Sequence, residues 1–499
     1  MSPGVGQNPP KQGRQGNRMH RRLGRVMLAV GGLLGAAAAQ AQLVQGSLEL
    51  RWGDAARATA AAPRFQASLV LDGGARLALD PAQARRGAGD LYALANRRVA
   101  VQFAADKSAG GARRIEAIVA ADEPADARDH GLAKVAGLAK ATLGSTRWIT
   151  LACRFDDIAE EQKPVSFFRD QYGDEPGLLG HYWHEVSYGK IDLAGSDALG
   201  WYALPNPRSH YVTVGEGGEE ADLGALFEDC TAAADADVDF SQVIGINMMF
   251  NGDLDGFAWG GGHCSTLDGG NRCWSATWNP PWSFNNLAPL AHEMGHGYGL
   301  PHSDNSDGDA DVYDNPWDVM SDNWSNVVRD PVYGARPQHI SVLQRDRLGW
   351  VDAARKRTIA SGAARARVNL DYASLGGAGN LQMLVLQTPP SPDPYRGIWY
   401  TVEARRPVGD YEAALAGDAV IIHRVGSDYR YVAESQDADR PPADVANNEG
   451  SMFKVGESWI SPDGLFSVYV ESATATGFVV VVAPDPKVTG GPGPRRRKQ

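Results

Sequence analysis

The sequence predicts a multidomain α+β protein in which an α/β domain lies between two β-rich regions. The chain has 499 residues, of which 43% are hydrophobic, and that length suits about three domains. Apolar and polar residues alternate over residues 43–121 and again over residues 354–485, as in strands with one buried face. Only residues 146–353 combine buried strands with helical spacing. We therefore expect a small β domain, an α/β domain with a mixed sheet, and an all-β, sandwich-like C-terminal domain.

Residues 1–41 have the organisation of a signal peptide. Three arginines between residues 21 and 25 precede the apolar run Val26–Ala39, and Ala39-Gln40-Ala41 is a small-x-small cleavage site. The run is too short to cross a bilayer. We expect a secreted or periplasmic protein that is not inserted in a membrane after cleavage. The arginines do not distinguish the two export routes.

The mature chain is expected to be strongly acidic. The signal peptide holds six basic and no acidic residues, so its removal leaves 42 basic and 60 acidic side chains, a formal charge of −18. This charge argues against nucleic acid or an anionic membrane as a partner.

The four cysteines all follow the signal peptide, and an even number in an exported chain favours disulfides. Cys264 with Cys273 would close a short loop and leave Cys153 with Cys230. Other pairings stay open. A second metal site is the alternative, but the C-x-x-C spacing of zinc ribbons is missing.

The N-terminal region, residues 43–121, is a candidate pro-region. It contains no cysteine, so no thiolate from it can cap a metal site. Whether it inhibits, assists folding or only precedes the next domain stays open. Residues 122–145, rich in Ala, Asp and Gly, are expected to be a linker. The expected strands are Ser47–Trp52, Phe65–Leu71, Arg98–Phe103 and Arg114–Val119.

The central region, residues 146–353, is expected to alternate buried strands with helices. Strands are predicted at Trp148–Phe155, Lys190–Leu193 and Val243–Phe250, and helices at Pro164–Tyr188 (interrupted by Gly173, Pro176 and Gly177), Ala221–Ala234 and His339–Trp350. The run Trp259–Gly262 suits an edge strand that pairs closely with an extended substrate. A plain glycine-rich loop is an equally good interpretation.

Residues 291–303 read AHEMGHGYGLPHS and carry the spacing H-E-x-x-H-x-x-G-x-x-H. On a helix, His292 and His296 lie on one face, and Gly299 allows the chain to turn so that His302 returns to the same ion. Three protein ligands with one open position are typical of catalytic zinc. Glu293 is then the general base. The alternative is three surface histidines, which the concentration of three of the chain's 11 His at these offsets disfavours.

An acidic loop follows the third histidine. Asp304, Asp307, Asp309 and Asp311 offer the oxygen ligands that calcium prefers. Their spacing differs from the EF-hand pattern, and a solvated acidic loop is the commoner explanation. Both interpretations stay open.

HEMGHGYGLPH resembles the zinc signature of the metzincin metallopeptidases, and Trp317–Ser321 resembles their Met-turn, with Met320 placed 18 residues after His302. A methionine packs below a metal without competing for it as a thiolate would. Several metzincins have a tyrosine two residues after this methionine, where the present chain has Asp322. The group that stabilises the oxyanion is therefore unassigned, with Tyr333 as a candidate.

The runs GHYWHEVSYGKIDLAG, PWDVMSD and RLGWVD are similar to those of the gametolysin-like metallopeptidases and of the related immune inhibitor A group. The likeness spans roughly residues 145–485. In the second group the third ligand is often acidic, so His302 favours the first. The resemblance implies a metzincin-type catalytic domain followed by a β domain.

The C-terminal region, residues 354–485, is expected to contain only strands, and His423 in one of them is expected to be a packed core residue. Residues 486–499 are predicted to form a disordered basic tail. The predicted strands are Leu381–Gln387, Trp399–Ala404, Asp418–Val425, Leu465–Val470 and Gly477–Val482.

We therefore predict a secreted, monomeric zinc endopeptidase that acts on a protein or glycoprotein. His292, His296 and His302 are the predicted ligands and Glu293 is the general base. One alternative is an exported protein that binds carbohydrate or protein on a non-catalytic scaffold. A second keeps the zinc chemistry but hydrolyses an ester or a non-peptide amide.

Overall fold

The computed structural model describes residues 42–56, 62–107, 113–121, 141–377, 379–391, 397–426, 430–439 and 448–484. The predicted signal peptide, most of the predicted linker and the basic tail lie outside these ranges. In the part of the chain that is described, no helix has the length and apolar character needed to cross a bilayer.

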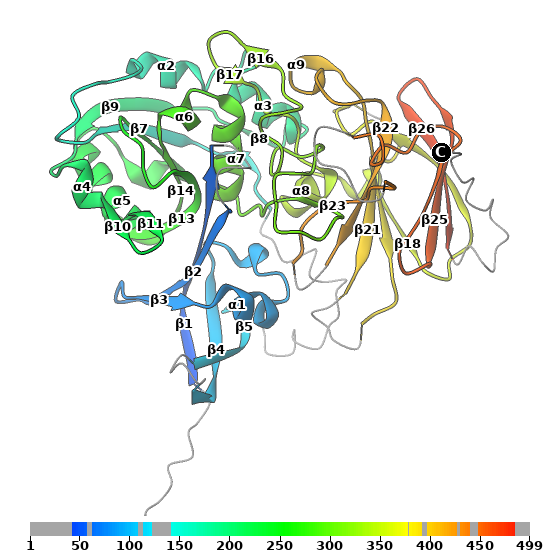
Figure 1. The fold of residues 1–499 in the computed structure, drawn as a ribbon, viewed down its shortest axis with the longest axis horizontal. Coiled ribbons are helices and arrows are strands. Elements are labelled where there is room, and N and C mark those ends of the chain that lie inside the picture. The colour runs from blue at the N-terminus through cyan, green and yellow to red at the C-terminus, as the bar shows by residue number, and fades with distance from the viewer. Residues whose placement is uncertain are drawn as a thin grey trace, which may run out of the picture. The chain divides into compact units, whose positions relative to one another are not determined.

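The central domain is built on a mixed sheet with the strand order β9-β7-β12-β14-β13 (Figure 1). Strands β9, β7, β12 and β14 are parallel neighbours, whereas β13 runs antiparallel to β14. A mixed sheet was expected here. The strands are β7 (Trp148–Arg154), β9 (Asp197–Ala203), β12 (Gly245–Phe250), β13 (Phe257–Leu267) and β14 (Gly270–Asn279).

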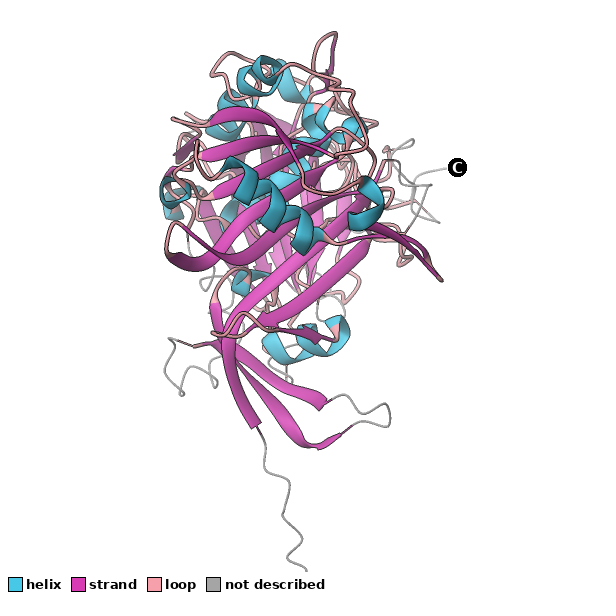
Figure 2. Cartoon of the chain, turned by 90° about the vertical axis from the view of Figure 1, so that its left-hand side faces the viewer, coloured by secondary structure: helices cyan, strands magenta, loops and turns pink. Residues whose placement is uncertain are grey.

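Helices cover both faces of this sheet, and one of them lies across the strands in Figure 2. Trp148 and Ala152 of β7 belong to one hydrophobic core, and the alternate residues Ile149, Leu151 and Cys153 belong to a second. A strand buried on both sides gives the nearly continuous apolar run seen in the sequence. The helices are α2 (Val165–Asp170), α3 (Leu179–Val186), α4 (Arg208–Tyr211), α5 (Leu223–Ala234), α6 (Pro281–Phe284), α7 (Leu287–Gly297) and α8 (Val342–Arg347).

Two predicted helices differ in extent from those observed. Residues 164–188 contain two short helices, α2 and α3, with the predicted interruption between them. The helix predicted at His339–Trp350 is only the six-residue α8, which ends before the positive-φ Gly349. The smaller elements of this domain are β6 (Gly144–Ser145), β8 (Ile191–Asp192), β10 (Val212–Gly215), β11 (Gly218–Ala221), η4 (Phe240–Gln242), β15 (Asp304–Asn305), β16 (Arg329–Asp330) and β17 (Gly334–Ala335).

The N-terminal region continues the central sheet. Strand β1 pairs with β2 and β4 and also, antiparallel, with β13, so that one ten-stranded sheet joins the two regions. The four predicted strands are present; β3 and the short helix α1, which Asp80 caps, were not predicted. The elements are β1 (Gln42–Ala55), β2 (Arg64–Val70), β3 (Arg76–Leu79), α1 (Pro81–Ala88), η1 (Tyr92–Leu94), β4 (Arg98–Lys107) and β5 (Arg113–Ala120).

The C-terminal region forms two sheets that share one core, as expected for a sandwich. Their orders are β15-β23-β22-β21-β20-β18 and β19-β26-β25-β24. His423 is fully buried in β22, as predicted. The elements are η5 (Ala353–Arg355), β18 (Lys356–Ala360), β19 (Ala366–Asp371), β20 (Met383–Gln387), β21 (Trp399–Arg405), α9 (Gly409–Glu412), β22 (Ala419–Val425), β23 (Glu434–Ser435), β24 (Ser458–Ile460), β25 (Phe466–Ala473) and β26 (Gly477–Pro484).

Both predicted cysteine pairs are confirmed as disulfides. Cys153–Cys230 joins β7 to α5, and Cys264–Cys273 joins β13 to β14. Disulfides persist in oxidising compartments. The two bridges therefore indicate an extracytoplasmic environment.

Candidate metal centre

The three predicted histidine ligands converge on one point. His292 and His296 lie one turn apart on α7, and their Nε2 atoms are 3.1 Å apart. After the helix, Gly299 has φ +88°, and the chain turns back so that the Nε2 atom of His302 lies 3.2 Å from that of His296. The turn expected at Gly299 is thus present.

Backbone carbonyl groups orient two of the rings. The Nδ1 atom of His292 lies 2.6 Å from the oxygen of Val319, and that of His296 lies 2.7 Å from the oxygen of Leu300. Because a carbonyl only accepts hydrogen bonds, each Nδ1 carries a hydrogen, so that in the neutral ring the lone pair lies on Nε2 and points to the centre. Burial lowers the pKa of His296 to about 3, which keeps its ring neutral. Converging lone pairs are the arrangement that a metal ion requires.

Asp54 of β1 completes the group. Its Oδ1 atom lies 2.7 Å from Nε2 of His302, and its Oδ2 atom lies 3.4 Å from Nε2 of His292 and 3.2 Å from Nε2 of His296. The ligand atoms of these four buried residues lie within 4.8 Å of one another. This donor set fits a metal ion, since three imidazoles and a carboxylate satisfy four coordination positions.

Asp54 is not among the ligands predicted from the sequence, where a cysteine would have been the recognisable capping ligand in the N-terminal region. The sequence signal for Asp54 is weak, because the stretch LELRWGDA also carries Glu49 and Arg51 and nothing in it distinguishes Asp54 from the other charged residues. In the structure, Asp54 is almost fully buried. An unpaired carboxylate is costly in such a position, so it demands a cation or a hydrogen-bond donor.

Glu293 lies beside the group with nothing to bind. It is 1% exposed, and neither of its carboxylate oxygens has a hydrogen-bond partner among the described residues. Burial, with the charge of Asp54 as the smaller cause, raises its pKa well above the usual value. Gly260 of β13 makes room for this side chain, because a Cβ atom there would lie 2.7 Å from Oε2 of Glu293.

Met320 lies directly beneath α7. A Cβ atom added to Gly295 would meet its sulfur at 2.4 Å. Asp318 holds the turn that contains Met320 in place, because it accepts hydrogen bonds from the backbone N–H of Met320 and from the hydroxyl of Ser303. The same turn supplies the Val319 carbonyl that orients His292. The predicted Met-turn residue thus packs under the metal centre.

The tyrosine at this centre is Tyr313. Its hydroxyl donates a hydrogen bond of 2.7 Å to Oδ1 of Asp54, and its ring packs edge-on against His302. The candidate from the sequence, Tyr333, instead packs against Phe167 and accepts the N–H of Leu287 through its backbone carbonyl. Tyr313 is not among the residues predicted from the sequence, because it lies inside the acidic loop, whose carboxylates are its dominant sequence feature.

The acidic loop is arranged differently from the predicted calcium set. Asp307 and Asp309 lie close to Asp314, which was not among the candidates. Asp304 forms an ion pair with Arg430. Asp311 accepts the backbone N–H of Tyr313 and so shapes the turn that carries this tyrosine to the metal centre.

No protein-family model matches this sequence, and no functionally described protein matches it significantly. The resemblance to metzincins therefore stays a prediction, carried by the motif residues themselves.

Proposed function

We propose that this chain is a secreted zinc-dependent endopeptidase. The observation that carries the proposal is the placement of an unpaired, buried carboxylate, Glu293, beside three imidazoles whose Nε2 atoms converge. Three histidines and an exchangeable fourth position are the usual donor set of catalytic zinc. When bound, zinc would polarise a substrate carbonyl and lower the pKa of a water molecule.

Glu293 is the proposed general base. Its raised pKa suits a carboxylate that must hold a proton between taking it from water and giving it to the leaving amine. A binding protein with a disused scaffold would have no need for a buried carboxylate without a partner, because such a group destabilises the fold. The orphaned Glu293 thus favours catalysis over the binding alternative.

Tyr313 is the proposed oxyanion-stabilising residue. Its hydroxyl donates to Oδ1 of Asp54, an oxygen that also lies 2.7 Å from Nε2 of His302. We infer that the carbonyl oxygen of a substrate would take a similar position, where a hydroxyl donor stabilises the developing negative charge.

The edge of β13 favours a peptide over an ester. Its residues Phe257–Gly261 pair with an extended segment of polypeptide, β1, directly beside the metal centre. Main-chain pairing of this kind is a general way to bind an extended peptide. A small ester or amide would leave this edge unused.

The proposal is tested by casein cleavage and by zinc analysis of the purified chain, both unmodified and with Asp54→Ala. We expect one zinc per chain and casein cleavage by at least one of these two forms. A chelator should abolish that cleavage, and so should Glu293→Gln introduced into the same form. Glu403→Gln is the matched control, because Glu403 is another fully buried glutamate with a raised pKa, about 7, far from the motif in sequence. Zinc far below one per chain, or cleavage that survives Glu293→Gln, would refute the proposal.

A further inference from the structure

The edge of β13 beside the metal centre is occupied by the chain itself. Residues Arg51–Ala55 of β1 pair antiparallel with Phe257–Gly261. This edge is where an extended peptide would add to the sheet under the function proposed above. A substrate and β1 cannot pair with the same edge at once.

The contact between the two strands is very close. At Gly261, with φ +142°, a Cβ atom would lie 2.1 Å from the carbonyl oxygen of Leu50. At Gly53, a Cβ atom would meet the ring of Trp259 at 2.9 Å. The glycines on both strands therefore permit an approach that side chains would prevent. The glycine-rich run of the sequence is thus a strand approached by another segment, and that segment is β1.

Two side chains of β1, Trp52 and Asp54, reach the metal centre. The ring of Trp52 stacks on His296 with the ring centres 4.6 Å apart and the planes within 3°. Asp54 lies between the three histidines, and its Oδ2 atom accepts no hydrogen bond from any described residue. A buried carboxylate oxygen that faces imidazole lone pairs is explained if a cation lies between them.

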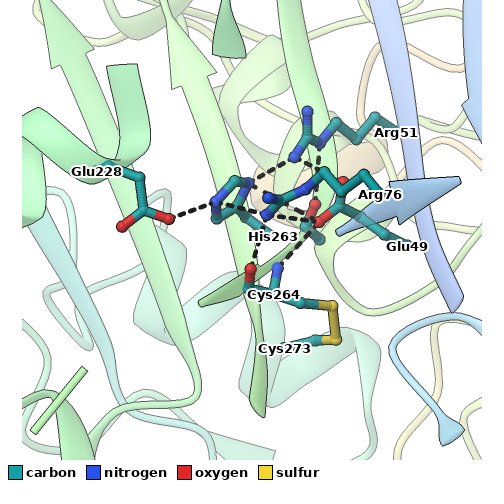
Figure 3. The surroundings of a disulfide bond; sticks show 8 residues. Glu49, Arg51, Arg76, Glu228, His263, Cys264 and Cys273 are labelled. Carbon is teal, nitrogen blue, oxygen red and sulfur yellow. Dashed lines mark hydrogen bonds and ion pairs between the residues drawn. A yellow bond between two sulfur atoms is a disulfide. The ribbon is translucent and has the colours of Figure 1, made fainter. Parts of the chain in front are cut away.

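A second contact fixes the register of β1 on β13 (Figure 3). The guanidinium of Arg51 donates to the carbonyl of Gly262 and contacts Nδ1 of His263, and it lies over the ring of Trp278. Glu49 accepts the backbone N–H of Cys264 at 2.9 Å. A shift of one residue would turn all of these side chains to the opposite face of the sheet. The same register places Asp54 opposite Ala258, at the metal centre.

We propose that β1 is an intramolecular inhibitor that fills the peptide-binding edge of β13 and places Asp54 in the metal's fourth coordination position. This proposal rests on the proposed peptidase function. Four protein ligands leave no open position, and sites closed in this way are structural rather than catalytic. The full chain is then latent until β1 leaves β13.

The test uses the full chain loaded with Co²⁺, whose visible spectrum reports its ligands, and compares the unmodified protein with Asp54→Ala and Asp54→Asn. Acetohydroxamate, a small metal-binding anion, serves as the probe of an open position. Asp72→Ala is the control, because Asp72 is an exposed aspartate of the same region. Circular dichroism establishes that each variant is folded, and Asp54→Asn keeps the side-chain volume if the alanine variant does not fold.

We expect the spectrum of the unmodified chain to differ from those of both Asp54 variants and to resist acetohydroxamate, which shifts only the variant spectra. Casein cleavage should rise roughly tenfold or more in the Asp54 variants, which corresponds to about 1.4 kcal/mol of competition by the internal ligand. A spectrum of the unmodified chain that responds to acetohydroxamate as strongly as the variants do would overturn the proposal. Spectra that change as expected without any cleavage would support Asp54 as the ligand and refute the peptidase function instead.

Discussion

The stacking of Trp52 on His296 gives a prediction that leaves every metal ligand intact. Trp52 is 3% exposed, and three rings surround it: His296 of α7, and Phe65 and Tyr92 of the N-terminal region. Only the first of these contacts joins β1 to the central domain. Trp52→Leu keeps an apolar side chain but removes the stack, which is worth about 0.5–1.5 kcal/mol for a buried aromatic pair.

The expected result is a two- to tenfold increase, roughly, in the fraction of time that β1 is detached from β13. Hydrogen exchange of the amides of residues 51–55 measures this opening, and the residual casein cleavage of the full chain should rise by a similar factor. Phe65→Leu is the matched control, because Phe65 packs against Trp52 and Tyr92 but makes no ring contact with His296 among the described residues. If Trp52→Leu accelerates exchange at residues 51–55 no more than Phe65→Leu does, the stack on His296 does not hold β1 in place.

Tyr313, His423 and Glu228 can each be tested by substitution. Tyr313→Phe, made together with Asp54→Ala, should lower kcat by roughly 10²–10³ with little change in KM, as expected when one oxyanion donor is lost; steady-state kinetics with a peptide would show an unchanged kcat if the hydroxyl has no such role. Burial lowers the pKa of His423 from the ordinary value of 6.5 to about 3 in the folded chain. Below pH 6.5 the unfolded chain therefore binds a proton that the folded chain does not. The free energy of unfolding should fall by about 2 kcal/mol between pH 7 and pH 5 as a result. Urea unfolding at the two pH values should show a smaller loss of stability in His423→Gln than in the unmodified chain. Equal losses would show that His423 does not cause the pH dependence. The side chain of Arg51 is held by Gly262, Trp278 and Nδ1 of His263, and Nε2 of His263 in turn contacts the carboxylate of Glu228. Peptides with Arg or Lys about three residues before the cleaved bond should therefore be preferred in kcat/KM; Glu228→Gln should reduce that preference, and cleavage of a peptide mixture with no basic preference would exclude this subsite.

The local part of the metal centre could be predicted from the sequence. His292, His296 and His302 fall within one helix and the turn that follows it, so helical spacing and a single glycine specify their convergence. Asp54 could not be predicted in this way, because it is separated from His302 by 248 positions. Its placement depends on which strand edge β1 pairs with, and alternation along one strand does not determine its partner.

The fold, too, could be predicted only where local sequence patterns specify it. Alternation identified the four principal N-terminal strands, and the buried run of β7 correctly indicated a strand covered on both faces. The ambiguity at Trp259–Gly262 could not be resolved, because a glycine-rich loop and a glycine-rich strand differ only in whether neighbours pair with them. In the structure, β14 and β1 both pair with β13. Tertiary contacts thus decided what local propensity left open.

Because β1 is held inside a continuous sheet, a cut in the chain would not by itself remove the proposed inhibitor. Residues 42–53 of β1 are paired with β4 and β2, and residues 51–55 with β13. If a protease cut the chain between residues 121 and 141, these three ladders would survive, and the inhibitor would become a second, non-covalently bound chain. As part of the same chain, the inhibitor has a high effective concentration at the metal centre. After the cut, its binding depends instead on the concentration of the free N-terminal fragment in solution. Activity should then appear on dilution after the cut rather than at the cut itself, so that a concentrated processed sample stays inactive while a dilute one acquires activity at the rate at which the two chains dissociate.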